Sequence, residues 1–365
     1  MDEGSRQEPT ANATDRARIK RALHWAKIEA KPAFSSSIGE IIGLPKNRRT
    51  LNYPTISVVI PCYRSGAYLI HAVESVLHQS GAFDLLEILV VDDNNDDPET
   101  IKSIEFARGL SKTRVIPNVR KRGSAGARNS GVECARGKWI AFLDADDWYL
   151  PDSLQSRMLA FSTYPDAEWF GGDFLTLERD GRFPQRGRFE GNLDAYHFLK
   201  PSYQAERKPI RLTRPIAEFL EQPPTNTIVT LLCKSLFERE NGFDESLLKQ
   251  QDFHLFLRLA STNDFVYVPQ PVAVYRLHET NSTRSEILTQ EWRIAALRKL
   301  AKLPQFETRL ASIHTRIFDL QLGNAYLLRE QGEFQKAFRA ALQGIISRPS
   351  SSAAWRCLAA AGLRR

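Results

Sequence analysis

Short apolar runs alternate with helical patterns from Thr55 to Asp147. Runs at residues 56–60, 86–91 and 139–143 predict buried strands, and residues 114–117 predict a shorter one. Apolar residues three or four positions apart predict helices over 68–80, 98–110 and 125–135. This β-α-β-α-β-α-β order predicts an α/β fold, in which helices flank a Rossmann-like, mostly parallel sheet.

Carboxylates follow two of the predicted strands. Asp92 and Asp93 end the second strand, and Asp144, Asp146 and Asp147 directly follow the strand at 139–143. Ligands of parallel sheets bind outside the carboxyl ends of the strands. We therefore expect both acidic clusters at one rim of the sheet, which favours a ligand site there.

The second of these clusters has two interpretations. Three carboxylates at the end of a buried strand repel one another and lose solvation, and a cation would offset both effects. Carboxylate oxygens suit Mg²⁺ or Mn²⁺, which proteins usually share with substrate phosphates. Asp144 and Asp146 then indicate a site for a metal and a diphosphate. The alternative is a solvated acidic turn that caps a helix beginning near Pro151.

The rest of the chain is less regular. It predicts a strand over 167–177, a charged and mobile loop region over 178–213, a strand near 227–232, helices over 235–240 and 251–262, and strands up to Arg276. From Trp292 onward the pattern is helical, and residues 322–349 look like one tetratricopeptide-type hairpin. A single such hairpin cannot bury its apolar face alone, so we expect it to pack on the main domain or on a partner.

Three regions follow from pattern and charge. Residues 1–54 carry 10 Lys/Arg and 6 Asp/Glu, and we expect a basic, partly disordered extension with a short helix at 16–31. Residues 55–284 carry 27 Lys/Arg and 31 Asp/Glu. We expect them to form the main domain, with halves at 55–147 and 148–284. Residues 285–365 carry 13 Lys/Arg and 6 Asp/Glu, and we expect them to form a helical region. The acidic centre argues against a nucleic-acid partner, whereas the basic ends permit attraction to an anionic membrane surface.

Composition narrows the class further. The hydrophobic content of 42% is ordinary for a globular protein, and no apolar run approaches the roughly 20 residues of a membrane span. The first 30 residues lack the apolar stretch of a secretory signal. The four cysteines are scattered and form no CxxC pair, which indicates free thiols in a reducing compartment.

Six segments, taken in order, resemble the family-2 glycosyltransferases, which have the GT-A fold. They are 58–64 (VVIPCYR), 90–93 (VVDD), 127–131 with 135–137 (ARNSG and ARG), 143–147 (LDADD), 241–245 with 251–259 (NGFDE and QDFHLFLRL), and 275–278 (YRLH). No single segment is specific, but their order and spacing together are. The resemblance covers about residues 55–283 and implies transfer of a sugar from a nucleoside diphosphate to an acceptor hydroxyl.

The resemblance implies a nucleotide pocket at the first two segments. Pro61, Tyr63 and Arg64 would line it. Asp93 would accept a hydrogen bond from the nucleotide base, and Asp92 would support the turn. The family often has Gly-Ser after this position, where this chain has two asparagines; Asn tolerates a left-handed backbone, so we expect the turn to survive.

The next two segments would handle the diphosphate. Asp146 would hold the divalent cation, and Asp144 would share either the metal or the ribose. Arg128 would pair with phosphate or base, the alternative being an arginine in a surface ion pair. Asp147 would orient its neighbours or cap a helix.

The acceptor side would carry the catalytic base. Asp252 is the expected general base of an inverting reaction, and it would also cap the helix over 251–262. The family commonly has Glu-Asp here, whereas this chain has Gln251, which keeps the shape of Glu and loses its charge. Arg276 and His278 would reach the diphosphate or simply close a packed strand.

The partners implied are a nucleotide-sugar donor and a glycan, lipid-linked or small-molecule acceptor, in bacterial surface polysaccharide or glycan synthesis. The implied location is cytoplasmic, peripheral at the inner face of the membrane. Two enzymatic alternatives fit poorly. A haloacid-dehalogenase-type phosphatase would place its DxD on the first strand, and a nucleotidyltransferase would carry a Gly-rich signature that is absent. A third alternative is a catalytically inactive GT-A homologue that acts as a binding module.

Overall fold

The computed structural model describes residues 53–204, 206–278, 285–347 and 351–362. Residues from Pro54 onward form one compact unit. The extension and the basic helix expected before residue 53 lie outside the described residues. So do residues 348 and 349, the end of the predicted tetratricopeptide hairpin.

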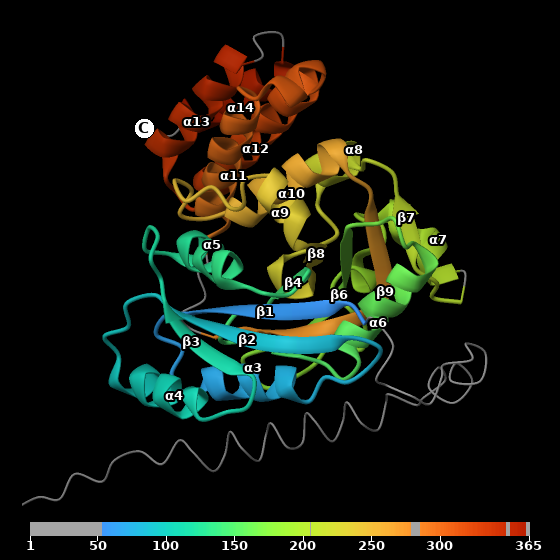
Figure 1. Ribbon diagram of the computed structural model, residues 1–365. Coiled ribbons are helices and arrows are strands. Elements are labelled where there is room, and N and C mark those ends of the chain that lie inside the picture. Colours follow the sequence, from blue (N-terminus) through green and yellow to red (C-terminus); the bar gives the residue numbers. More distant parts are fainter. Residues whose placement is uncertain (1–52, 205, 279–284, 348–350, 363–365) are drawn as a thin grey trace, which may run out of the picture. The chain divides into compact units, whose positions relative to one another are not determined.

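The first half of the unit is a parallel sheet covered on two faces (Figure 1). Its strands are β1 (Thr55–Cys62), β2 (Asp84–Asp92), β3 (Thr113–Pro117) and β4 (Trp139–Phe142), in the order β3-β2-β1-β4. Helices α3 (Tyr68–Leu77) and α4 (Pro98–Arg108) lie on one face and α5 (Ser124–Cys134) lies on the other. All seven elements were predicted, with ends that differ by at most three residues.

The second half extends the sheet with mixed directions. Its strands are β5 (Trp148–Tyr149), β6 (Trp169–Leu177), β7 (Ile210–Leu212), β8 (Leu231–Cys233) and β9 (Phe265–Arg276). The order continues from β4 as β8-β6-β9-β5, and β7 pairs with β9. Only β6 and β9 are parallel; the other pairings are antiparallel. The α/β prediction is confirmed, and its parallel part is the half that carries the two acidic clusters.

Shorter elements connect these strands. They are α6 (Ser153–Thr163), α7 (Lys200–Gln204), α8 (Ile216–Glu221), α9 (Lys234–Arg239) and α10 (Gln251–Thr262), with 3₁₀ turns at Glu190–Asn192, His197–Leu199 and Thr227–Val229. The predicted strand near 227–232 is therefore half 3₁₀ turn. The region 178–213, predicted as a loop, contains two 3₁₀ turns, α7 and β7.

Helix α5 lies unusually close to the sheet because of a glycine. A Cβ on Gly131 would come within 2.3 Å of Val59 Cγ1, far inside van der Waals contact. Glycine therefore lets the helix backbone approach β1 more closely than any other residue would. This approach fixes α5, whose first turns point toward the carboxyl ends of β1 and β4.

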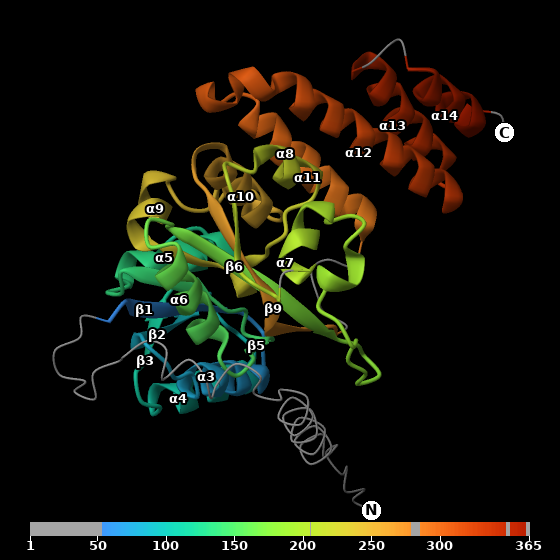
Figure 2. The ribbon, with the colours of Figure 1, turned by 90° about the vertical axis from the view of Figure 1, so that its right-hand side faces the viewer.

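The C-terminal region is helical, as predicted (Figure 2). It comprises α11 (Glu286–Leu300), a 3₁₀ segment (Pro304–Arg309), α12 (Leu310–Glu330), α13 (Phe334–Ser347) and α14 (Ser352–Gly362). Helix α11 buries Ile294, Leu297 and Leu300 in the main core, so the C-terminal region packs on the main domain through this helix. Helices α12, α13 and α14 pack on one another through small buried residues such as Ala341 and Ala354. Within the described residues, no helix combines the length and apolar character needed to span a bilayer.

Candidate active site

The loops after β1, β2 and β4 meet at one edge of the sheet. The three strands are parallel and in register, with Cys62 beside Asp92 and Val59 beside Phe142. The loops that follow them therefore emerge at the same rim. This brings together the predicted nucleotide segments at 58–64 and 90–93 and the predicted metal segment at 143–147.

A hydrogen-bonded turn joins the first two loops. Asp92 Oδ1 accepts from the backbone N–H of Asn95 at 3.0 Å and from its Nδ2 at 2.6 Å. Asn95 Nδ2 also donates to the carbonyl of Cys62 at 2.8 Å. Asn94 has a φ of 58°, so the left-handed turn predicted for this asparagine pair is present. Asp92 thus holds the loop in place rather than facing outward.

Asp93 is buried beneath this turn. Its Oδ1 accepts from Asn118 Nδ2 at 2.6 Å, and its Oδ2 accepts from the backbone N–H of Gly123 at 2.8 Å. These bonds fix the carboxylate between the end of β3 and the start of α5. Each oxygen keeps a further lone pair, so the group can still accept a hydrogen bond from a ligand.

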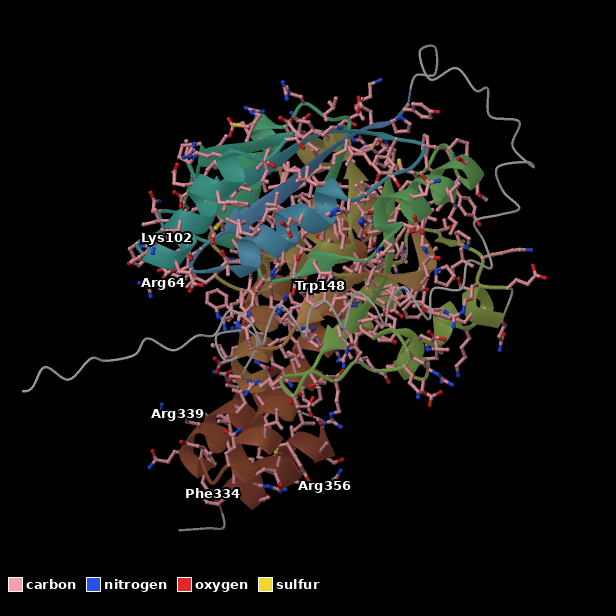
Figure 3. All side chains as sticks on the ribbon, turned by 90° about the horizontal axis from the view of Figure 1, so that it is seen from below. Arg64, Lys102, Trp148, Phe334, Arg339 and Arg356 are labelled. Atoms are coloured by element: carbon pink, nitrogen blue, oxygen red, sulfur yellow. The ribbon has the colours of Figure 1, made fainter. Side chains whose placement is uncertain are left out.

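The loop after β1 presents an exposed aromatic ring with cations around it. Tyr63 is exposed, and the guanidinium of Arg122 lies 4.8 Å from its ring centroid. Arg64 adopts a φ of 47° and pairs with Asp96 at 2.8 Å. Figure 3 shows Arg64 extending from this edge. An exposed aromatic ring beside two guanidinium groups suits stacking of a base and pairing with phosphate.

Arg128 faces the acidic turn rather than solvent. Its Nη2 lies within hydrogen-bond reach of Asp144 Oδ1, and the arginine side chain is only 6% exposed. The alternative of an arginine in a surface ion pair is therefore wrong. Burial, with Asp146 and Asp252 nearby, raises the pKa of Asp144, although Arg128 opposes the shift.

Asp146 meets the end of β9. His278 Nε2 lies 2.7 Å from Asp146 Oδ2, and Arg276 Nε donates to the backbone carbonyl of Asp146 at 2.9 Å. The guanidinium of Arg276 also lies 4.7 Å from the ring of Trp148 and 4.2 Å from that of Tyr68. The structure thus joins the YRLH segment to the LDADD segment across 130 residues.

Asp147 links the LDADD turn to the end of β9 through a backbone hydrogen bond. Its Oδ1 accepts the backbone N–H of Arg276 at 2.8 Å, while Oδ2 has no hydrogen-bond partner. The residue is 1% exposed, and burial, with Asp146 and Asp144 nearby, raises its pKa well above the usual range. The next helix begins at Ser153 with Asp152 as its N-cap. The interpretation of a solvated turn capping that helix is therefore wrong, and so is a capping role for Asp147.

Asp252 enters the site from the second half of the domain. It lies in the first turn of α10, after Gln250 with a φ of 59°, and its Oδ1 accepts from the N–H of Phe253 at 2.8 Å. Gln251 Nε2 donates to Ser124 Oγ at 2.7 Å, which places the start of α10 beside the start of α5. Asp252 is close enough to Asp144 to contribute to its raised pKa. The N-cap position itself belongs to Gln250, so the expected capping role of Asp252 is wrong.

Sequence reasoning missed one contributor from the C-terminal helices. Arg293 of α11 donates from Nε to Gln250 Oε1 at 2.9 Å, and its guanidinium lies 5.5 Å from the ring of Phe253. These two residues bracket the segment that carries Asp252. No motif marks Arg293, because its position depends on how α11 packs against α10.

The donor set suits a cation that also binds substrate. Asp146 and His278 offer a carboxylate oxygen and an imidazole nitrogen, and both side chains are partly exposed. Among the described residues, no group of three His, Cys, Asp or Glu side chains is arranged to hold a metal. A Mg²⁺ or Mn²⁺ ion here would complete its shell with diphosphate and water oxygens, as such ions usually do.

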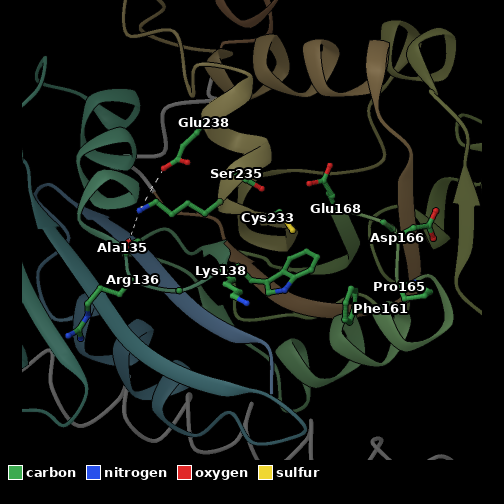
Figure 4. A pocket seen from close by; sticks show the side chains of 14 residues that line it. Ala135, Arg136, Lys138, Phe161, Pro165, Asp166, Glu168, Cys233, Ser235 and Glu238 are labelled. Atoms are coloured by element: carbon green, nitrogen blue, oxygen red, sulfur yellow. Dashed lines mark hydrogen bonds and ion pairs between the residues drawn. The ribbon is translucent and has the colours of Figure 1, made fainter. Parts of the chain in front are cut away.

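A separate hollow lies at the opposite ends of the strands (Figure 4). It has a volume of about 580 Å³ and is lined by residues around Gly137, Glu168 and Lys234. These residues precede β4 and flank β8, so the hollow faces the amino end of β4. Lys234 there already bonds to the carbonyl of Ala135 at 2.7 Å. None of the predicted site residues lines it.

Parts of the chain are similar to known proteins. Residues 57–212 match the family model described as Glycosyl transferase family 2. The chain is 37% identical over 131 residues to the succinoglycan biosynthesis protein ExoO of Rhizobium meliloti (strain 1021), which covers 35% of this chain and 36% of that protein. It is 29% identical over 230 residues to the amylovoran biosynthesis glycosyltransferase AmsB of Erwinia amylovora, covering 61% of this chain and 70% of that one.

Solved structures show the same fold. Residues 1–349 of S. aureus TarS match with a TM-score of 0.56 at 18% identity, covering 81% of each chain. The same TarS segment in complex with UDP-GlcNAc matches with a TM-score of 0.53 at 16% identity, covering 80% of this chain and 81% of that one. Residues 57–212 are therefore similar to the glycosyl transferase family 2 model, and the chain has the GT-A fold.

Proposed function

We propose that the protein transfers a sugar from a nucleoside-diphosphate sugar to an acceptor hydroxyl with inversion at the anomeric carbon. The observation that carries this proposal is the hydrogen bond from Gln251 to Ser124, which brings the start of α10, with Asp252, beside α5, whose Arg128 pairs with Asp144. Two of the matched proteins are named for polysaccharide biosynthesis, and TarS is described in complex with UDP and with UDP-GlcNAc. We extend both features to this chain: a nucleotide-sugar donor, and a role in bacterial surface polysaccharide or glycan assembly in the cytoplasm.

The donor nucleotide would lie over the first two loops. The exposed ring of Tyr63 offers a stacking surface, and Arg64 and Pro61 line the same loop. Asp93, fixed by Asn118 and Gly123, is held ready to accept a hydrogen bond from the base. Because these bonds exist without the ligand, the pocket needs little reorganisation to bind it.

The diphosphate would lie over the LDADD turn. Asp146 and His278 would hold a divalent cation, which when bound would supply positive charge to the departing diphosphate. Asp144, already paired with Arg128, is placed to meet the ribose or to share the cation. Arg276 lies against Asp146 and adds a guanidinium at the same edge.

Asp252 would act as the general base. Its carboxylate takes the proton of the acceptor hydroxyl, whose oxygen forms the new bond to the anomeric carbon. The bond from that carbon to the phosphate oxygen breaks, and the nucleoside diphosphate leaves with the electron pair. Attack and departure on opposite faces of the sugar produce inversion.

The inactive-homologue alternative is less well supported. A protein that only binds its ligand does not need a general base, two side chains that hold a cation and a preformed nucleotide-binding turn at one site. The direct test is a screen of common nucleotide sugars with Mn²⁺, measuring release of nucleoside diphosphate and the anomeric configuration of any product. Release with one donor and an inverted product supports the proposal. No release with any donor, together with normal nucleotide binding, would favour the binding module.

A further inference from the structure

The last two helices expose a continuous apolar patch. Phe338, Leu342 and Ile346 of α13 are 41%, 41% and 72% exposed, and Trp355 of α14 is 53% exposed. The three α13 residues are four positions apart, so they form one stripe along that helix. Their neighbours Ala337, Ala341 and Ile345 are buried against α12 and α14, so the stripe is a second, outward face.

The stripe of α13 continues onto α14. A Cβ on Gly362 would lie 3.9 Å from Phe338 Cε2, so this side of α14 adjoins the stripe. Trp355 precedes Gly362 by seven residues, or two helical turns, and so lies on the same side of α14. The helices are antiparallel, with Ile345 beside Ala354 and Ala337 beside Ala361. Trp355 therefore lies level with the Leu342–Ile346 end of the stripe.

Basic side chains border this patch on both sides. Arg339 follows Phe338 on the outer side of α13, and Arg356 follows Trp355 on the far side of α14 by helical periodicity. Figure 3 shows the two arginines extending from the C-terminal helices in different directions. The sequence from 334 to 365 contains six Lys/Arg and no Asp or Glu. An apolar centre with aromatic residues, flanked by two arginines, is complementary to an anionic bilayer.

We propose that the Phe338–Leu342–Ile346–Trp355 patch docks the enzyme on an anionic membrane surface. The apolar side chains would enter the boundary between headgroups and acyl chains, while Arg339 and Arg356 would bind lipid phosphates. Partial burial of two helices is far from a membrane span, so the binding is reversible and sensitive to salt. This inference does not depend on the sugar-transfer activity, because the patch lies on α13 and α14 and contains none of the proposed site residues.

The test is sedimentation of the full chain with vesicles of phosphatidylcholine, with and without phosphatidylglycerol. We expect binding to the anionic vesicles, weakened by salt, and little binding to the neutral ones. Ile346→Ser with Trp355→Ser, and separately Arg339→Gln with Arg356→Gln, should each weaken that binding by roughly tenfold or more. Phe106→Ser and Lys102→Gln on α4 are matched controls, an exposed apolar and an exposed basic residue, and should leave it unchanged.

Two results would overturn the proposal. In the first, the full chain does not bind anionic vesicles, or the patch substitutions leave that binding unchanged although the circular dichroism spectra of the variants match that of the wild type. The other is a self-associated wild type, seen by light scattering, that the Ile346→Ser and Trp355→Ser substitutions convert to monomer without any lipid. That second result would assign the patch to another copy of the chain.

Discussion

Arg128 on α5 and Asp144 after β4 form an ion pair, with Nη2 and Oδ1 2.5 Å apart. The pair neutralises one carboxylate of the acidic turn before any ligand binds. We therefore propose that Asp144 positions the ribose and does not hold a metal alone. Asp146 faces His278 instead of a permanent cation, and we propose it as the main metal ligand.

Removing Arg128 should destabilise the fold and not only the site. Arg128→Met would leave the Asp144 carboxylate without its cation in a largely enclosed position, at a cost of about 2 kcal/mol in the free energy of unfolding. Adding Asp144→Asn should restore part of that loss. Urea unfolding of both single variants and the double variant measures the coupling. Strict additivity of the two single effects would mean that the pair contributes nothing.

Metal dependence should be confined to Asp146 and His278. Titration calorimetry of UDP should show binding in Mn²⁺ that EDTA weakens by at least tenfold, since the diphosphate and the protein share the ion. Asp146→Asn and His278→Gln should weaken binding in Mn²⁺ to the level of the EDTA sample. Asp166→Asn, which breaks an exposed ion pair with Arg211, is the control and should bind as wild type. UDP affinity that is equal with and without the metal would refute this assignment.

His254 should make the fold sensitive to mild acid. Burial, and then Arg258, lower its pKa from 6.5 to about 4, with Asp244 opposing. Between these values the unfolded chain binds the proton and the folded chain does not, so stability falls as pH falls from 6.5 to 4. The loss from this group reaches about 2 kcal/mol at pH 5.

The measurement is the urea midpoint at pH 7 and pH 5. His254→Gln should reduce the difference between the two midpoints, whereas His78→Gln, at an exposed position, should not. If the urea midpoints of wild type and His254→Gln change equally with pH, the pKa of His254 is not lowered in the folded state.

Arg293 should couple the C-terminal helices to catalysis. Its bond to Gln250 holds the start of α10, so Arg293→Met should lower kcat of sugar transfer by roughly tenfold with little change in the KM for donor. Arg298→Met, on the exposed side of the same helix, is the matched control. If the kcat of Arg293→Met equals that of the wild type, Arg293 contributes only to packing and not to sugar transfer.

The parallel half of the fold could be predicted because its signals are local. Apolar runs, the proline at the start of α4 and the helical spacing of 68–80 each act within a few residues. β5, β7 and the direction of β8 could not be predicted, since they are three residues long or less and are defined by their partners. The pairing of Arg128 with Asp144 could not be predicted either, because it depends on how closely α5 approaches the sheet. In the sequence, only Gly131 indicates an approach close enough to bury that arginine.

Sequence motifs gave the members of the site but not their contacts. The acidic turn was expected as a cluster of similar carboxylates, and the structure gives each a different partner: Arg128, His278 or the backbone of Arg276. The tetratricopeptide interpretation of the C-terminal hairpin remains a prediction. So do the ligand, metal and catalytic roles of the site residues: Pro61, Tyr63, Arg64, Asp93, Arg128, Asp144, Asp146 and Asp252.

The central claim is that Asp252 is the general base, and sugar transfer by Asp252→Asn tests it most directly. With the donor found in the screen, this variant should bind donor and Mn²⁺ within about twofold of wild type. Its kcat should fall by roughly 10² to 10⁴, the usual contribution of a positioned base. Sugar transfer at the wild-type rate, with the variant folded and donor bound, would contradict the account.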